Sequence, residues 1–286
     1  MLITAMPVAV RYMLLSALGF SLMTACVKAV SAYGIPVFEI VAARAAVSLL
    51  ISYVDIRRKR ISVWGEHHLL LVSRGLVGAL ALVCVYYSVT TLPLASAAVL
   101  QYTYPAFTAL IAWFFLKERV QLATVVCIAL SFAGLVLMVQ PQASGQLAMP
   151  PLSVAAALLG ALGSAIAYVL VRRLSTCEDS SVIIFYFPLI ALPVSLVLLG
   201  DAMVMPTLEA AVLLVLVGIF TQVGQVGLTK AMAAGKAGKV AAYAYVQVIF
   251  SALLGLVLFA EVPTTWTVIG GGLIMLGALI NALWKR

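Results

Sequence analysis

The chain has 286 residues, of which 65 % are hydrophobic and 9 % charged, and its mean hydropathy is +1.20. This composition leaves no room for a soluble domain and predicts an all-α polytopic membrane protein. The net charge of +8 does not indicate nucleic-acid binding, because the basic residues gather at joints between apolar segments. Four widely spaced cysteines and the absence of nucleophile, phosphate-loop or zinc signatures predict neither an enzyme nor a cofactor.

Apolar segments long enough to cross a bilayer follow one another along the whole chain. Ten transmembrane helices are predicted, at residues 8–30, 36–54, 68–89, 94–115, 120–139, 152–171, 181–199, 209–229, 239–259 and 265–284. The first segment has features of a signal peptide, but it lacks a small-residue cleavage site. We therefore expect it to remain as a span.

The two halves of the sequence resemble each other. A shift of 143 residues places Tyr102 on Tyr245 without any gap. Chance matching in a biased composition is the alternative, but the register holds over the whole length and favours a duplication. Pro105 has no equivalent at Val248, which predicts that the two halves bend differently.

The duplication divides the chain into two five-helix repeats, residues 1–143 and 144–286. Five spans is an odd number, so the second repeat must be inverted relative to the first. Two inverted repeats are typical of secondary transporters, whose central site lies between the halves.

Basic residues concentrate at every second joint. Fifteen of the seventeen lie beside even-numbered joints or the termini when Arg11 and Arg74 are counted with them. Because cytoplasmic loops retain lysine and arginine, we expect both termini to be cytoplasmic.

Polar and aromatic side chains recur at helical spacing in several spans. In the fourth span, Gln101, Tyr104 and Thr108 share one helix face. The candidate substrate-binding residues are Arg44, Tyr86, Gln101, Tyr102, Tyr104, Tyr168, Gln222, Gln225, Tyr243, Tyr245 and Gln247. Phenol and amide groups suit a zwitterionic or mixed polar and apolar solute. The alternative, that these residues only join helices, stays open.

Arg44 is predicted near the middle of the second span, where a charge is costly unless it faces protein or water. Two roles are open: binding the carboxylate of a substrate, or satisfying backbone carbonyls. All nine acidic residues lie at or near predicted span ends. We therefore expect transport without a coupled ion.

Four stretches carry a resemblance to a known family: GIPVFEIVAAR at the second span, LASAAVLQYTYPAF in the fourth, LKER after it, and AYVLVRRL ending the sixth. With ten spans in a five-plus-five repeat, the whole chain resembles the drug/metabolite transporter superfamily, EamA type, and most of all the bacterial amino-acid exporters of the YddG type.

That resemblance implies a multi-pass inner-membrane protein that exports aromatic and other neutral amino acids. It also implies a basket-shaped cavity built from spans one to four and six to nine, used by alternating access. A carrier of another solute, such as S-adenosylmethionine, a sugar or a drug cation, and a channel are the alternatives. The oligomeric state is left open, and a monomer is compatible with the sequence.

Overall fold

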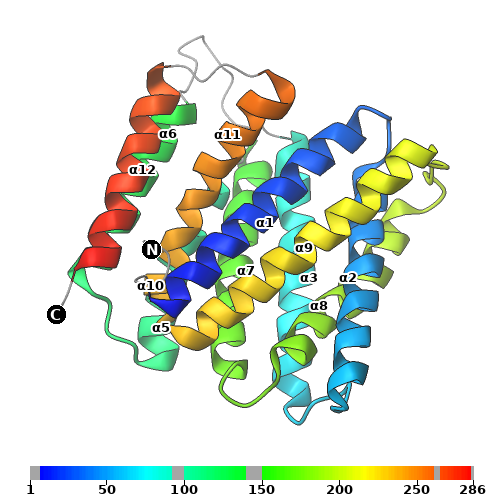
Figure 1. Cartoon of the computed structure of the whole chain (residues 1–286), viewed down its shortest axis with the longest axis horizontal. Coiled ribbons are helices and arrows are strands. Elements are labelled where there is room, and N and C mark those ends of the chain that lie inside the picture. Colours follow the sequence, from blue (N-terminus) through cyan, green and yellow to red (C-terminus); the bar gives the residue numbers. More distant parts are fainter. Residues whose placement is uncertain (1–6, 92–99, 140–149, 261–264, 285–286) are drawn as a thin grey trace.

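The computed structural model describes residues 7–91, 100–139, 150–260 and 265–284, and every regular element in this part of the chain is a helix (Figure 1). The helices are α1 Val8–Ser31, α2 Val37–Lys59, α3 His68–Thr91, α5 Tyr104–Leu116, α6 Leu122–Val139, α7 Pro151–Leu174, α8 Ser180–Leu199, α9 Leu208–Ala234, α10 Ala237–Ala242, the 3-10 helix η2 Tyr243–Tyr245, α11 Val246–Phe259 and α12 Thr265–Leu283. Each of the ten predicted spans contains a helix, so the all-α polytopic class is confirmed. Among the described residues, seven helical spans are long and apolar enough to cross a membrane.

Helix starts follow from local chemistry. Pro7 and Pro36 precede α1 and α2, and Pro151 opens α7, positions where the missing N–H group of proline costs nothing. Asp179 and Thr207 cap α8 and α9 by accepting hydrogen bonds from backbone N–H groups. Inside the long helices the backbone groups bond to one another, which a lipid environment requires.

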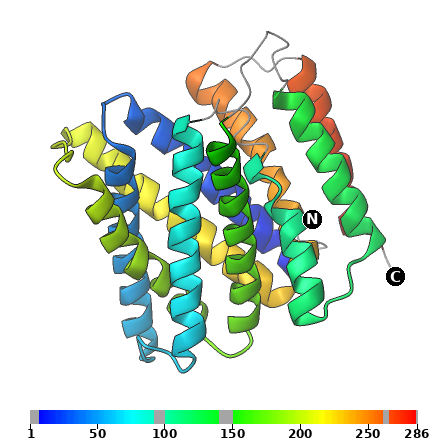
Figure 2. The same cartoon turned by 180° about the vertical axis from the view of Figure 1, so that it is seen from behind.

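The packing of the helices repeats itself between the halves. The 143-residue shift makes α7 the equivalent of α1 and α9 the equivalent of α3. The structure packs α1 on α9 and, equivalently, α7 on α3. The same shift relates the contact of α2 with α9 to that of α8 with α3. It also relates the contact of α1 with α11 to that of α7 with α5. Helices α6 and α12, which are each other's images, pack together at one edge of the molecule (Figures 1 and 2).

The contact between α6 and α12 depends on glycine. A Cβ on Gly134 would lie 2.4 Å from the carbonyl oxygen of Gly270, and one on Gly277 would lie 3.0 Å from that of Cys127. The 143-residue shift maps Gly134 onto Gly277 and Cys127 onto Gly270, so the two close approaches are images. The predicted two-repeat topology is confirmed, while the division after residue 143 falls outside the described residues and stays a prediction.

The two repeats run in opposite directions. Helix α1 starts at the lower end of Figure 1, whereas α7 starts at the upper end, as Figure 2 also shows. Joints 60–67, 117–121, 175–179 and 235–236 all lie at the lower end, which we call the basic end. It is the end at which the even-numbered joints place most lysines and arginines.

The two halves were predicted to bend differently, and for the halves as a whole this stays a prediction, but spans four and nine share one feature. In the ninth span, η2 separates α10 from α11 around Tyr245, and in the fourth a turn at Tyr102 precedes α5. Pro105 occupies the first turn of α5, where proline starts a helix instead of bending one. The interruption is therefore shared by both halves.

The two interrupted spans also end alike. Lys117 after α5 and Ala260 after α11 both adopt the left-handed conformation, with φ of 53° and 54°. These residues are 143 positions apart, so the two C-caps are equivalent.

Candidate functional site

Four tyrosines from three parts of the chain meet where the halves join, and we call them the tyrosine cluster. The rings of Tyr102 and Tyr245 stack at 5.9 Å, that of Tyr104 lies 6.2 Å from Tyr102, and Tyr168 of α7 meets Tyr104 edge-on at 5.2 Å. The Tyr245 hydroxyl donates to the Tyr102 carbonyl at 2.8 Å. Because Tyr102 and Tyr245 are equivalent residues, their stack lies on the axis that relates the two repeats.

Two buried polar groups, one on Gln101 next to the cluster in sequence and one on Tyr243 in η2, have no hydrogen-bond partner among the described residues. Gln101 donates through Nε2 to Ser164 of α7 at 3.2 Å, but its Oε1 has no hydrogen-bond partner among the described residues. The same holds for the buried hydroxyl of Tyr243. Buried polar atoms are rarely left unpaired in folded proteins, so each of these atoms is suited to a polar ligand or to water.

Two arginines approach one aromatic ring, and we call them the arginine pair. The guanidinium carbon of Arg74 in α3 lies 5.0 Å from the ring centroid of Phe187 in α8, and that of Arg44 in α2 lies 5.9 Å away. Arg74 is 4 % exposed and Arg44 is 9 % exposed. A cation over an aromatic face is stabilised, most strongly where water is excluded.

No described carboxylate neutralises the arginine pair. The ion pairs of the described residues involve other cations. Arg74 donates from Nη2 to Gln225 Oε1 over a long 3.4 Å, and its Nε has no acceptor within the described part of the chain. Arg44 reaches the sulfur of Met23 at 3.7 Å. A buried charge without a counter-charge is costly, so an anionic group beside these guanidinium groups would stabilise them.

The arginine pair and the tyrosine cluster adjoin. Tyr168 lies within electrostatic range of Arg74, and its ring packs against Tyr104. The site therefore has a cationic part, contributed by α2, α3, α8 and α9, and an aromatic part, contributed by α5, α7 and η2.

Other predicted site residues have different surroundings. Gln222 accepts from Ser48 and donates to Ser52 at 2.9 Å, so it joins α9 to α2. Gln247 accepts from Ser21 through its backbone carbonyl at 3.0 Å. Tyr86 belongs to α3, but its side chain lies outside the described part of the structure. The binding role of every predicted site residue stays a prediction.

The sequence did not identify Arg74 as a site residue, nor Phe187, the ring that the arginine pair approaches. Arg74 was counted with the joint residues, but the structure buries it in α3, about 9 Å along the helix from His68. Arg44 was selected because it lies inside a predicted span, and the same criterion applied to Arg74 would have selected it as well. Phe187 gave no signal, since it is an apolar residue in an apolar segment.

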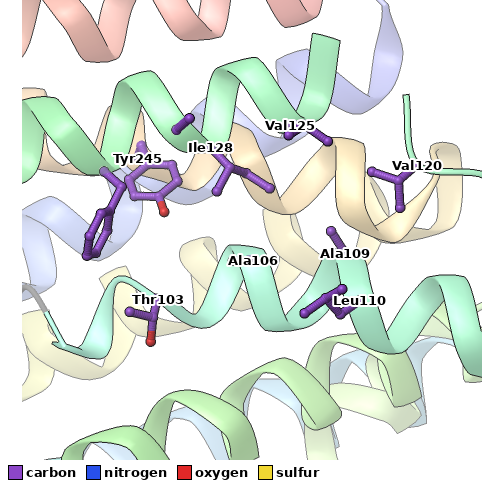
Figure 3. Close-up of a pocket in the computed structure, with 10 residues that line it drawn as sticks. Thr103, Ala106, Ala109, Leu110, Val120, Val125, Ile128 and Tyr245 are labelled. Carbon is purple, nitrogen blue, oxygen red and sulfur yellow. The ribbon is translucent and has the colours of Figure 1, made fainter. Parts of the chain in front are cut away.

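An apolar cavity lies beside the tyrosine cluster, between α5 and α6 (Figure 3). Its volume is about 440 Å³, and its lining includes Ala106, Leu110 and Ile128 together with Tyr245. This lining suits a hydrocarbon chain better than a polar solute. The polar chemistry of the site lies with the arginine pair and the tyrosines.

A polar contact fastens four helix ends at the basic end, and we call it the Glu118 clamp. Arg172 donates from Nε to Glu118 Oε1 at 3.1 Å and from Nη1 to the carbonyls of Met232 and Ala233 at 2.9 and 3.0 Å. Glu118 Oε2 accepts from the backbone N–H of Ala237 at 2.7 Å. The clamp ties α5 to α7, α9 and α10.

Comparison with known proteins agrees with this architecture. The EamA-like transporter family matches residues 8–140 and 151–283, two ranges whose limits lie 143 residues apart. The chain is 33 % identical to the pseudopaline exporter CntI of Pseudomonas aeruginosa over 95 % of each chain. It is 30 % identical to solute carrier family 35 member G1 of Mus musculus, over 96 % of this chain and 78 % of that protein.

A crystal structure shares the fold with a TM-score of 0.85 and 20 % identity, covering 96 % of each chain. Together with the two-repeat helical fold, these matches identify a multi-pass membrane transporter and not an enzyme. The chain belongs to the EamA-like transporter family.

Proposed function

We propose that this protein is a secondary carrier that exports amino acids, aromatic and other neutral ones among them, across the bacterial inner membrane. The observation that carries the proposal is the buried arginine pair, Arg44 and Arg74, which no described carboxylate neutralises. A substrate carboxylate would supply the missing negative charge through bidentate hydrogen bonds.

The remaining groups fit the other parts of an amino acid. The tyrosine cluster offers aromatic surface to an apolar side chain and attracts a cation. The unpaired Gln101 Oε1 is an acceptor suited to an ammonium group. One chain contains all of these residues, so a monomer is sufficient for the proposed site.

The inverted repeats support an alternating-access cycle. The axis that relates them passes through the stack of Tyr102 and Tyr245, so rocking of one half against the other would expose the site to each side in turn. We place the basic end, with both termini, in the cytoplasm, because lysine and arginine are retained there. Opening toward the cytoplasm then requires that the Glu118 clamp be released.

We further propose that transport needs no coupled ion. Every acidic residue in the described ranges lies in a joint or near a helix end, so none is placed to carry a proton at mid-membrane. Reconstituted protein should give the same initial rate with and without an imposed proton gradient, and a rate that follows the gradient would contradict this part.

The Pseudomonas relative supports the outward direction, since it is named an exporter. Its substrate, pseudopaline, also favours a second candidate, a carrier of a different small metabolite. The two candidates share the fold and the transport cycle and differ in the solute that the arginine pair accepts.

Counterflow in proteoliposomes tests the proposal. Vesicles are loaded with one unlabelled amino acid at a time, labelled phenylalanine is added outside, and every ion gradient is omitted. Transient accumulation that depends on the internal amino acid is expected. Internal phenylalaninamide, which keeps the ring and the amino group but lacks the carboxylate, should drive little accumulation.

Substitution of the arginine pair supplies the control. Arg44→Gln and Arg74→Gln should abolish or weaken counterflow, whereas Arg58→Gln, at an exposed residue of the basic end, should leave it unchanged. If no amino acid drives accumulation in folded protein, the substrate assignment fails and the second candidate stands. Ohmic current without counterflow would indicate a channel.

A further inference from the structure

A second hollow, a groove, lies at the surface of the molecule, and its lining differs from the residues of the arginine pair and the tyrosine cluster. It runs between α5 and α7, with Leu70 of α3 at its side, and its volume is about 710 Å³. Figure 2 shows α3, α7 and α5 in this order across the face that carries it. Its apolar lining includes Phe115, Ile166 and Leu170, and Phe115 is 80 % exposed.

Two basic side chains stand at one end of the groove. Lys117 follows the last turn of α5 and Arg173 belongs to the last turn of α7, so both lie at the basic end. Both are exposed, and neither forms an ion pair with a carboxylate in the described part of the chain. Successive residues of a helix point about 100° apart, so Arg172 turns inward to Glu118 while Arg173 faces the groove.

The dimensions match one leaflet of a bilayer. From Leu162 to Arg173, the lining of α7 rises about 16 Å at 1.5 Å per residue. Half of a hydrocarbon core is about 15 Å thick. An acyl chain therefore fits along the groove when its headgroup lies beside the basic pair.

We propose that this groove binds an anionic phospholipid of the leaflet that contacts the basic end. Its acyl chain packs along Ile166 and Leu170, and its phosphate is held between Lys117 and Arg173. The C-terminal ends of α5 and α7 carry partial negative charge, which explains why an anion there needs two cations. The bound lipid joins α5 to α7 directly outside the Glu118 clamp. The proposal does not depend on the identity of the transported solute.

Native mass spectrometry of the full-length protein in detergent tests this site. Phosphatidylglycerol and phosphatidylcholine with identical acyl chains are added at equal concentration. One retained phosphatidylglycerol is expected, with at least about tenfold weaker retention of phosphatidylcholine, given an electrostatic contribution from each basic residue. Glycerol phosphate without acyl chains should not compete, because the groove contributes through its apolar lining.

Two variants address the two parts of the site. The double variant Lys117→Gln/Arg173→Gln should lose the preference for phosphatidylglycerol, while Arg57→Gln/Arg58→Gln, which removes two exposed charges from the last turn of α2, should keep it. Leu170→Trp fills the groove with both charges intact and should lower retention of either lipid. Equal retention of the two lipids by the wild type, an unchanged preference in Lys117→Gln/Arg173→Gln, or undiminished retention in Leu170→Trp would overturn the proposal.

Discussion

Two arginines of this protein, Arg172 and Arg74, differ both in their burial and in the number of acceptors around their guanidinium groups. Arg172 at the basic end is 23 % exposed in its side chain and has an acceptor for each of its described contacts, the carboxylate of Glu118 and the carbonyls of Met232 and Ala233. Arg74 is 4 % exposed, has one long hydrogen bond to Gln225, and its Nε has no partner within the described ranges. The more exposed guanidinium group thus has an acceptor for each described contact, whereas the more buried one has a nitrogen without an acceptor.

The proposed function assigns a structural role to Arg172 and a binding role to Arg74. A satisfied ion pair stabilises the conformation in which it forms, so Arg172 fastens the basic end. A buried cation without a counter-charge destabilises the empty protein and is stabilised when an anion arrives. Removal of Arg172 should therefore lower the stability of the fold. Removal of Arg74 should instead weaken transport without lowering that stability.

The largest effect is expected at the clamp. Arg172→Ala should lower the free energy of unfolding by about 2–3 kcal/mol, because it leaves the Glu118 carboxylate and two helix-end carbonyls without their donor. Denaturation in detergent measures it. Arg58→Ala, at an exposed position, should cost less than about 0.5 kcal/mol. The double variant Glu118→Gln/Arg172→Gln should recover part of the loss, and an additive loss would contradict the pairing.

The next effect is expected in transport. Arg74→Gln should raise the KM for a carboxylate-bearing substrate by about 10- to 100-fold, the equivalent of one charge-assisted hydrogen bond of about 1.5–3 kcal/mol. The same variant should unfold at an equal or higher temperature than the wild type, because an unpaired buried charge has been removed. Counterflow and a thermal melt measure the two quantities. A lower melting temperature with unchanged KM would make Arg74 structural, like Arg172.

A smaller effect is expected where the two repeats meet. Tyr245→Phe removes the hydrogen bond to the Tyr102 carbonyl but keeps the ring stack, and should cost about 1 kcal/mol of unfolding free energy. Tyr33→Phe removes an exposed hydrogen bond to Glu209 and is the matched control, with a smaller expected loss. Equal losses for the two variants would show that the stack alone joins the repeats at this point.

The smallest effect is expected at Glu178, in the joint between α7 and α8. Partial burial raises the pKa of this carboxyl, but hydrogen bonds from the backbone N–H groups of His67 and Glu66 lower it more, so its pKa falls below the ordinary 4.5. A lowered folded-state pKa stabilises the fold above pH 4.5, and this contribution is lost as pH falls through the lowered value.

Glu178→Gln should therefore flatten the acid side of a stability-versus-pH curve without changing its shape above neutrality. Melting temperatures measured between pH 3 and pH 8, a range of about five pH units, give this slope. The pKa of Asp179 is also lowered, from its ordinary 3.8, so part of the slope at the most acidic pH values should remain in the variant. An unchanged slope would contradict the assignment.

Many residues of the candidate site could be selected from the sequence because polar residues are conspicuous in apolar spans. Arg44, Tyr102, Tyr104, Tyr168 and Tyr245 were all selected in this way, and the structure brings them into one region with Gln225. Selection of polar residues did not distinguish binding from helix joining, as Gln222 shows: its amide oxygen and its amide nitrogen each bond to a serine of α2. That distinction depends on which side chains face each other across a helix pair.

The sequence by itself determined the number of spans, the duplication and the transporter family. A bilayer requires about 20 apolar residues per span, so composition along the chain marks each helix regardless of its neighbours. The alternation of basic joints likewise needs no knowledge of packing.

Only the tertiary structure decided that Arg44 and Arg74 share the ring of Phe187, that Tyr102 and Tyr245 stack on the axis between the repeats, and that both flanking helices are interrupted there. The physical reason is that hydropathy fixes where a helix lies along the chain but not its rotation, crossing angle or partner. Those are set by side-chain packing between segments more than a hundred residues apart, and they place the charges on which the proposed function depends.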